Sequence, residues 1–193
     1  MSPPHKRFIT REEYLARERQ AEYKSEYIDG EVVAMTGASR RHNLIATNII
    51  ISLGQQLKGL PCELYPSDMR VYIPATNKYT YPDVVAVCEE PQFEDSYIDT
   101  LLNPGLIIEV LSDSTEAYDR GKKFRDYRSI DSLAEYILVA QDESRIEQYL
   151  RQADGNWLLT ERRFLEDIVT LASIQCTLAL RDVYDKVPLR GRA

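Results

Sequence analysis

A chain of 193 residues is long enough for one domain with its own hydrophobic core and short for two. Its composition, 44% hydrophobic and 28% charged, is ordinary for a globular protein, and no apolar run approaches the length of a membrane-spanning helix. A net charge of −7 argues against an extended basic surface for nucleic acid, although local clusters of arginine and lysine remain compatible with a positive patch.

The cysteines and the N-terminal sequence bear on the cellular location. Cys62, Cys88 and Cys176 are odd in number and lack metal-binding spacing, so we predict free thiols in a reducing compartment. No apolar segment follows the basic N-terminus, as one would in a secretory signal. We therefore expect a soluble cytoplasmic protein without a membrane partner.

A helix and a hairpin are predicted near the N-terminus. Thr10 and Glu13 have the spacing of a capping box, which predicts a helix over residues 11–24. The Asp29-Gly30 pair is a strong signal for a hairpin turn between two short strands.

A second, longer helix is predicted over residues 42–57, because apolar residues recur there at helical spacing. Residues 62–73 have the pattern of a strand, and residues 74–78 that of a turn. Residues 89–104 are acidic and irregular between two prolines, so we expect a surface loop that borders the functional site.

Two short apolar runs each carry an acid. Asp83 follows Pro82 and opens the run 84–87, and Glu109 lies inside the run 106–111. Both runs are rich in β-branched residues and bounded by proline or glycine, which is typical of buried strands. Burying a carboxylate is costly unless an opposite charge compensates it, and neighbouring strands lie roughly 5 Å apart. The two acids are therefore candidates for sharing one cation.

Structural roles remain open for both acids. Asp83 follows a proline, as turn-forming aspartates often do, and Glu109 can form an ion pair with Lys123 or Arg120 that joins a helix to the sheet. In the metal interpretation, two carboxylates suit Mg2+ or Mn2+, which leave their other positions to water and phosphate. Together with a nearby lysine, such an ion forms the outline of a phosphodiester-cleaving site.

The C-terminal half is predicted to contain one helix and several strands. Asp113 and Glu116 have the spacing of another capping box, which predicts a helix to about residue 129 that carries Lys123 and Tyr127 on one face. Strands are predicted over residues 135–140, 145–150, 157–163 and 167–171. Residues 174–184 are ambiguous, with a last helix as one interpretation.

The order Pro82-Asp83, then Glu109 on the next apolar strand, then a lysine, resembles the PD-(D/E)xK nuclease superfamily. A fuller pattern across residues 14–149 resembles the Uma-two family of restriction endonucleases more closely. That pattern comprises Asp29-Gly30-Glu31, His42, Asp68-x-Arg70-Val71, Glu109-Val110-Leu111-Ser112, Ser114-Thr115, Asp119-Arg120-Gly121-x-Lys123, Tyr127 and Glu135-Tyr136.

The resemblance implies an α+β fold with an α/β-like core: a restriction-endonuclease-like mixed central sheet flanked by helices, with an extra N-terminal helix and hairpin and with C-terminal strands. We expect a single domain over residues 1–193 with its core at about 42–140. Asp83 and Glu109 would be catalytic residues and ligands of Mg2+ or Mn2+. The superfamily's usual lysine position holds Leu111, so its role would pass to Lys123 or Lys122.

Three further residues are candidates for auxiliary roles. The resemblance favours Glu31 and His42 as catalytic residues and Asp68 as another metal ligand. Glu31 can equally be a solvated hairpin residue, and Asp68 can be an exposed acid paired with Arg70. His42 begins a predicted helix, where its ring can reach a phosphate or a carboxylate or simply neighbour the cap.

The expected function is Mg2+-dependent hydrolysis of DNA phosphodiester bonds by an endonuclease. A homodimer is an expectation that follows, since two sites related by a two-fold axis cut both strands of a duplex most simply. A catalytically silent module of the same fold, which binds nucleic acid or protein, stays open, and Leu111 and the acidic charge support it. A small-molecule hydrolase on this scaffold also stays open.

Overall fold

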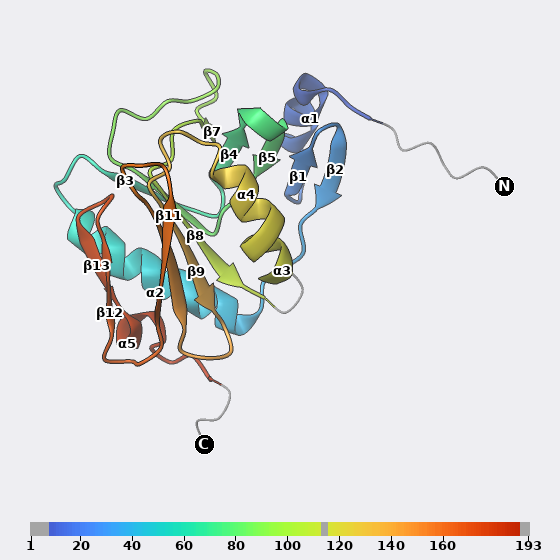
Figure 1. Ribbon diagram of the computed structural model, residues 1–193. Helices are drawn as coiled ribbons and strands as arrows, with labels where there is room; N and C mark the ends of the chain where they lie inside the picture. The colour runs from blue at the N-terminus through green and yellow to red at the C-terminus, as the bar shows by residue number, and fades with distance from the viewer. Residues whose placement is uncertain (1–7, 113–115, 190–193) are drawn as a thin grey trace.

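The structure is a computed structural model that describes residues 8–112 and 116–189 (Figure 1). Its N-terminal part forms a helix and a five-stranded sheet of order β2-β1-β5-β4-β7, in which β4 and β7 are parallel and the other neighbours antiparallel. These elements are α1 (Arg11–Glu18), β1 (Ser25–Ile28), β2 (Glu31–Ala34), β4 (Arg70–Ile73), β5 (Lys78–Thr80) and β7 (Thr100–Leu101), with a 3-10 turn, η1 (Pro74–Thr76), between β4 and β5.

A six-stranded sheet of order β11-β10-β9-β8-β6-β3 forms the centre of the molecule. β8 and β9 are parallel and the other neighbours antiparallel, so the predicted mixed central sheet is confirmed. Its strands are β3 (Glu63–Pro66), β6 (Val84–Val87), β8 (Leu106–Leu111), β9 (Glu135–Ala140), β10 (Ile146–Arg151) and β11 (Trp157–Arg162).

Helical segments cover both faces of this sheet (Figure 1). One face packs against α2 (Arg40–Leu57), which confirms the predicted long helix, and the hairpin β12 (Ile168–Leu171)–β13 (Cys176–Ala179) and α5 (Leu180–Val183) pack beside it. The other face carries a continuous segment made of α3 (Glu116–Tyr118), the π-helical η2 (Asp119–Lys123) and α4 (Phe124–Tyr127). The flanked sheet of the α+β prediction is therefore present.

The side chains of β6 and β8 alternate between the two faces, as the period of a strand requires. Val84, Ala86, Ile108 and Val110 pack in the cluster of α2, whereas Val85, Val87, Ile107 and Leu111 pack in the cluster of α4. Burial on both sides explains why these strands have unbroken apolar sequences. By the same alternation Glu109 points to the side of α4.

The N-terminal predictions hold except for the length of the first helix. Thr10 and Glu13 form the capping box, and Asp29 and Gly30 turn the β1–β2 hairpin with φ of 45° and 94°. The helix ends at Glu18 rather than at residue 24. The carboxylate of Glu18 accepts hydrogen bonds from the backbone N (2.8 Å) and Oγ (2.5 Å) of Ser25, which fixes the start of β1 against the helix.

Residues 62–73, predicted as one strand, form two strands in different sheets. Pro66 ends β3, since it has no N–H for the ladder, and Met69 N donates to Pro66 O (3.1 Å) to close a turn. β3 then pairs with β6 in the central sheet, and β4 pairs with β5 in the N-terminal sheet. This division places the two sheets on either side of the 66–69 turn.

The prediction of three free thiols is wrong for two of them. β3 and β6 pair antiparallel with Glu63 opposite Val87, so Cys62 and Cys88 follow as the next opposed pair and form a disulfide. Sequence spacing could not reveal this pairing because it depends on strand register. Cys176 is a buried free cysteine.

The C-terminal strand predictions are confirmed as β10, β11 and β12. Residues 174–184, which the sequence left ambiguous, contain β13 and then the short helix α5. The predicted capping box of Asp113 with Glu116 and the motif residues Ser114 and Thr115 fall outside the described residues, since 113–115 are not described.

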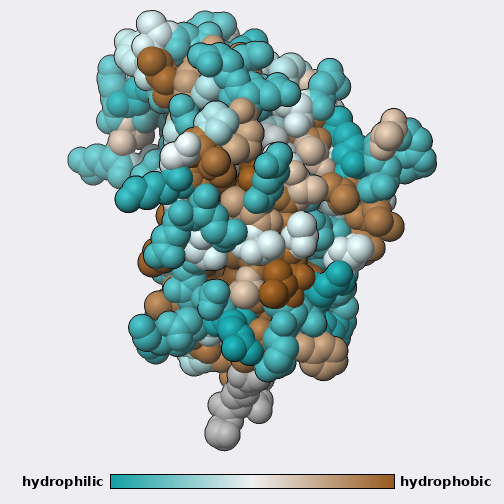
Figure 2. Space-filling view, turned by 90° about the vertical axis from the view of Figure 1, so that its left-hand side faces the viewer, coloured by the Kyte–Doolittle hydropathy of each residue, from teal (hydrophilic) through white to brown (hydrophobic). Residues whose placement is uncertain are grey.

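Hydrophobic side chains on the face shown in Figure 2 form small groups interspersed with hydrophilic ones. Within residues 8–112 and 116–189, no helix is both long and apolar enough to cross a membrane.

Candidate active site

Asp83 and Glu109 lie opposite each other on adjacent strands. β6 and β8 pair with Val84 opposite Ile108, and continuing this register by one residue sets Asp83 opposite Glu109. Directly opposed side chains of an antiparallel pair point to the same face, with Cβ atoms about 5 Å apart. The two acids that the sequence singled out are thus brought together where β6 begins.

The carboxylate of Asp83 is held by a backbone amide and by a histidine. Its Oδ2 accepts a hydrogen bond from Val110 N (2.7 Å) and lies 3.1 Å from Nε2 of His42. His42 lies in the first turn of α2, where its backbone N donates to the N-cap Ser39 (3.1 Å). Of the partners that the sequence left open for His42, the structure therefore supplies a carboxylate.

The carboxylate of Glu109 is 4% exposed and bound by two donors. Its Oε1 accepts a hydrogen bond from Tyr127 Oη (2.9 Å) and lies 2.7 Å from Lys123 Nζ. Burial raises the pKa of Glu109 to about 8, although the ammonium of Lys123 opposes the rise. The negative charges of Asp83 and Asp119 add to it. Glu109 is therefore a carboxylate whose negative charge is costly in this setting.

Lys123 lies among three carboxylates. Its Nζ is 2.7 Å from Glu109, 3.7 Å from Asp119 and 3.9 Å from Glu26. Burial alone would lower the pKa of Lys123, but the carboxylates of Glu109, Glu26 and Asp119 raise it well above its usual value. The side chain is consequently held as an ammonium with more negative than positive charge around it.

The π-helical segment η2 carries Lys123 at its last position. Phe124 N donates to Asp119 O, five residues back, which is the hydrogen bond of a π-turn. In this segment Lys123 is buried against the sheet and Lys122 is exposed. Of the two lysines that the sequence left open, Lys123 is therefore the one that contacts Glu109.

These side chains open into one pocket of about 1080 Å³. Asp83, Glu109, Lys123 and His42 all line it. The pocket lies between the N-terminal half of α2, the β1–β2 hairpin with the residues that follow it, and the segment α3–η2. Asp83 and Glu109 are therefore accessible to a ligand even though Glu109 is buried.

Two pocket carboxylates were missed as site residues by sequence analysis. Glu26 of β1 lines the pocket and accepts a hydrogen bond from the hydroxyl of Thr80, and Asp119 of η2 also lines it. The available signal for Glu26 was the one used for Glu109, an acid inside a predicted strand.

Glu31 and Asp68 lie outside this pocket. Glu31 begins β2 opposite Ile28 and is half-buried. The side chain of Asp68 is 85% exposed and pairs with Lys24 (Oδ1 to Nζ, 3.0 Å), not with Arg70, which binds Asp99 instead. Their roles as catalytic residue and metal ligand stay predictions, and the structure does not bring them to Asp83 and Glu109.

The acidic loop over residues 89–104 packs away from the pocket. Asp99 binds Arg19, the C-cap residue that follows α1 (Oδ2 to Nε, 2.8 Å), and Glu94 binds Arg11 of the same helix. Among the described residues that line the pocket, none comes from this loop. The expectation that it borders the site is therefore not met; it joins α1 to the N-terminal sheet.

The pocket fits a hard divalent cation held by two carboxylates. In the part of the chain that the structure describes, Asp83 and Glu109 engage their partners through Oδ2 and Oε1, which leaves Oδ1 and Oε2 without a hydrogen bond. No three His, Cys, Asp or Glu side chains of those residues are grouped to hold a metal ion. Mg2+ usually binds through one or two carboxylates and completes its shell with water, and the two acids suit that mode.

Comparisons with known proteins agree with this chain's pattern of residues. The sequence profile of the Uma2 family, described as "Putative restriction endonuclease", matches residues 11–181. Two uncharacterized proteins of Synechocystis sp. (strain PCC 6803) are similar over most of their lengths. Protein sll1609 is 43% identical over 155 residues, which cover 80% of this chain and 88% of that protein. Protein slr1290 is 37% identical over 176 residues, which cover 91% of each chain.

A solved structure shares the fold. The crystal structure of a "putative nuclease belonging to DUF820" from Anabaena variabilis superposes with a TM-score of 0.72 at 16% identity, covering 86% of this chain and 93% of that one. This likeness confirms the predicted restriction-endonuclease-like fold. With the profile match over most of its length and two relatives above 30% identity, the chain belongs to the Uma2 family.

Proposed function

We propose that this protein is a Mg2+-dependent endonuclease that hydrolyses phosphodiester bonds in DNA. The observation that carries the proposal is the placement of Asp83 and Glu109 on opposed strand positions, with the ammonium of Lys123 at 2.7 Å from Glu109, in an open pocket. The description of the Uma2 family and that of the Anabaena protein support a nuclease role.

When bound at the two carboxylates, Mg2+ would polarise the phosphate and lower the pKa of a bound water. The chain's own residues hold the reacting groups in place. Val110 N and His42 fix one oxygen of Asp83, and Tyr127 fixes one oxygen of Glu109. Such supporting contacts keep metal ligands in a productive orientation.

Lys123 would act as a charged donor in this reaction. Three carboxylates keep it an ammonium, so it offers protons for hydrogen bonds and a positive charge rather than a free base. It can orient the attacking water or stabilise the negative charge that builds on the phosphate oxygens. At 2.7 Å from Glu109, the ammonium of Lys123 would lie next to the carboxylate that would hold the ion.

The alternative is a catalytically silent module that binds nucleic acid or protein. The contact between Lys123 and Glu109 fits this alternative as well, because an ion pair can serve only to join η2 to the sheet. The acidic net charge favours it as well. Cation binding by the two acids separates the two functions.

The test is titration calorimetry with Mn2+ on the wild type and on Asp83→Ala, Glu109→Ala and Asp68→Ala. We expect both site variants to lose the heat of Mn2+ binding. In a DNA cleavage assay, their rates should fall by more than about 10–100-fold, the usual loss when a group that only supports a metal ligand is removed. Asp68→Ala should keep both, because its side chain is exposed outside the pocket. Thermal unfolding checks that each variant folds.

Any of three results would overturn the proposal. Cleavage at the wild-type rate in both Asp83→Ala and Glu109→Ala would remove the two acids from the reaction. Mn2+ binding that persists in those variants and disappears in Asp68→Ala would move the metal to another site. A wild type that binds DNA but does not cut it with any divalent ion would favour the silent module.

A further inference from the structure

The pocket continues beyond the carboxylates along α2. His42, Ala46 and Ile50 line it at spacings of four residues, which places them on one side of the helix. At 1.5 Å per residue, Ile50 lies about 12 Å along the helix axis from His42. One wall therefore begins at the histidine that contacts Asp83 and carries Ala46 and Ile50 over the next two turns, with Asn43 and Thr47 beside them.

The facing wall, residues 33–38, is apolar apart from Thr36. Val33 and Ala34 at the end of β2, followed by Met35, Gly37 and Ala38, line the pocket opposite α2. The volume of about 1080 Å³ is at the upper end of the range for sites that enclose a small organic ligand. A cation with its water and one phosphate needs only the polar end, so the apolar end has room for a further chemical group.

The basic side chains of the pocket are already engaged. Lys24 contacts Asp68, His42 contacts Asp83, and Lys123 contacts Glu109. Binding of a continuous duplex depends on many lysine and arginine contacts with phosphates. This pocket offers more apolar surface than unpaired positive charge. It is therefore better suited to bind a nucleic-acid base than a row of phosphates.

We propose that the wall formed by Ala46 and Ile50 receives an unpaired base next to the scissile phosphate. The inference rests on the proposed nuclease function and names its substrate class: single-stranded or locally unpaired DNA, in preference to continuous duplex. A base has to leave the stack to enter a pocket of this kind, and the cost is lowest where it is already unpaired. The apolar wall then replaces the stacking that the base has lost.

The experiment compares three DNA substrates of one sequence in the presence of Mn2+: single-stranded, fully paired, and paired with a short unpaired stretch. We expect the single strand and the unpaired stretch to be cut at least about tenfold faster than the full duplex. Ala46→Phe should slow cleavage of the single strand at least about tenfold by filling the wall. It should leave the heat of Mn2+ binding unchanged, because Ala46 carries no ligand atom.

Matched variants separate filling of the pocket from damage to the helix. Ile51→Phe adds an aromatic ring on the same helix at a side chain that is 53% exposed, outside the pocket, and should leave cleavage unchanged. Ala46→Leu is a smaller change that should give an intermediate effect if Ala46→Phe unfolds. Thermal unfolding of all three variants is measured alongside.

The outcomes distinguish this inference from the proposed function. Equal cleavage of duplex and single strand, or wild-type cleavage by a folded Ala46→Phe, overturns the inference and leaves the nuclease intact. If the wild type cuts nothing, the proposed function fails, and fluorescence anisotropy with a labelled single-stranded oligonucleotide still decides about the wall. Binding weakened in Ala46→Phe but not in Ile51→Phe supports a base-binding wall, and equal binding by all variants overturns it.

Discussion

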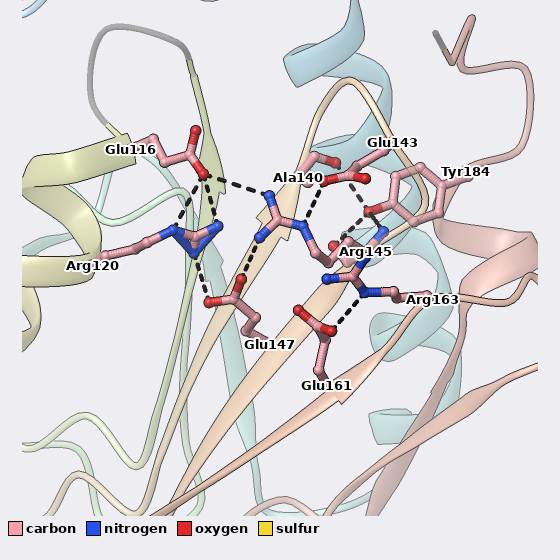
Figure 3. A network of polar contacts seen from close by, with 9 residues as sticks. All are labelled: Glu116, Arg120, Ala140, Glu143, Arg145, Glu147, Glu161, Arg163 and Tyr184. Carbon is pink, nitrogen blue, oxygen red and sulfur yellow. Dashed lines mark hydrogen bonds and ion pairs between the residues drawn. The ribbon is translucent and has the colours of Figure 1, made fainter. Parts of the chain in front are cut away.

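Two clusters of ion pairs include residues of the same helical segment, η2, and the clusters differ in burial and in charge balance. Arg120 of η2 points outward and binds Glu147 of β10 (Nη1 to Oε2, 2.6 Å), in a network that also contains Arg145 and Glu116 (Figure 3). Lys123, three residues later, points into the pocket. The outer network is partly exposed, whereas the side chains of Lys123 and Glu109 are 9% and 5% exposed.

The outer network alternates its charges. Figure 3 shows each of its arginines beside a glutamate: Arg120 with Glu116, Arg145 with Glu147 and Arg163 with Glu161. The fourth acid, Glu143, also pairs with Arg145 and is 54% exposed, so the surplus negative charge of the network reaches water. The contacts of the network join Glu116 of α3 and Arg120 of η2 to Arg145 and Glu147 at β10, and Glu161 and Arg163 pair with each other beside them.

The pocket cluster does not balance. Asp83, Glu109, Glu26 and Asp119 face the ammonium of Lys123 and the ring of His42. An excess of buried carboxylates is unfavourable, and a bound cation would relieve it. The comparison teaches that an ion pair on this segment is structural where the surplus charge reaches water and points to function where the surplus charge is buried.

The largest expected effect on stability comes from removing the buried ammonium of Lys123. Lys123→Met should lower the free energy of unfolding by about 3–5 kcal/mol, the usual cost of leaving a buried charge without its partner. Urea denaturation at neutral pH measures it. Because the remaining carboxylates would then hold a divalent ion without competition, Mn2+ should restore part of the lost stability.

The double variant Lys123→Met with Glu109→Gln is the control. Removing both charges should recover most of the loss, since a neutral pair no longer buries an unpaired ion. An unfolding free energy of Lys123→Met equal to that of the wild type, with or without Mn2+, would contradict the view that this ammonium compensates the pocket.

A pH effect of intermediate size is expected from the ion pairs of Asp99 with Arg19 and Arg70. Although burial opposes it, hydrogen bonds from Arg19 and Arg70 hold the pKa of Asp99 well below its usual range. A carboxyl group with a depressed folded-state pKa stabilises the protein fully above its unfolded pKa, about 3.9, and loses that contribution as the pH falls further. Stability should therefore drop below about pH 4.

Thermal unfolding between pH 7 and pH 2 measures this effect. Asp99→Asn should be less stable than the wild type at pH 7 and should show a shallower fall below about pH 4, because it has no proton to gain there. Asp185→Asn, at an exposed carboxylate, should follow the wild-type curve. Parallel curves for Asp99→Asn and the wild type would show that Asp99 has no part in the acid sensitivity.

The sequence alone reached the elements whose causes are local. The capping box of Thr10, the turn at Asp29-Gly30 and the apolar stripe of α2 follow from spacings within a few residues, and all three are present. The pairing of Asp83 with Glu109 was also within reach, because two adjacent buried strands leave few arrangements for two acids.

What the sequence could not supply depends on register and on long-range packing. The Cys62–Cys88 disulfide requires the pairing of β3 with β6, and the role of Glu26 requires β1 to face η2 across the pocket. The contact of Lys123 with Glu109 depends on the π-turn of η2, and no simple residue spacing in the sequence indicates a π-turn. The first two features depend on contacts between segments that are far apart in the chain, and the third changes the helical period.

The smallest expected effect lies in the outer network. Arg145→Ala should lower the free energy of unfolding by only about 1 kcal/mol, because its ion pairs with Glu147, Glu143 and Glu116 are partly exposed to water. Arg163→Ala is the matched control on the neighbouring strand: its side chain is 60% exposed, and the unfolding midpoint should not move measurably.

Salt and Mn2+ sharpen the contrast between the two clusters. Raising the ionic strength should shrink the difference between Arg145→Ala and the wild type, since exposed charges are screened, and should leave the loss in Lys123→Met nearly unchanged. Mn2+ should stabilise Lys123→Met more than Arg145→Ala, because two of the carboxylates that Arg145 leaves, Glu116 and Glu143, are 41% and 54% exposed to water, whereas Lys123 leaves carboxylates buried in one pocket. Equal stabilisation of both variants by Mn2+ would mean that charge balance does not distinguish the pocket from the structural network.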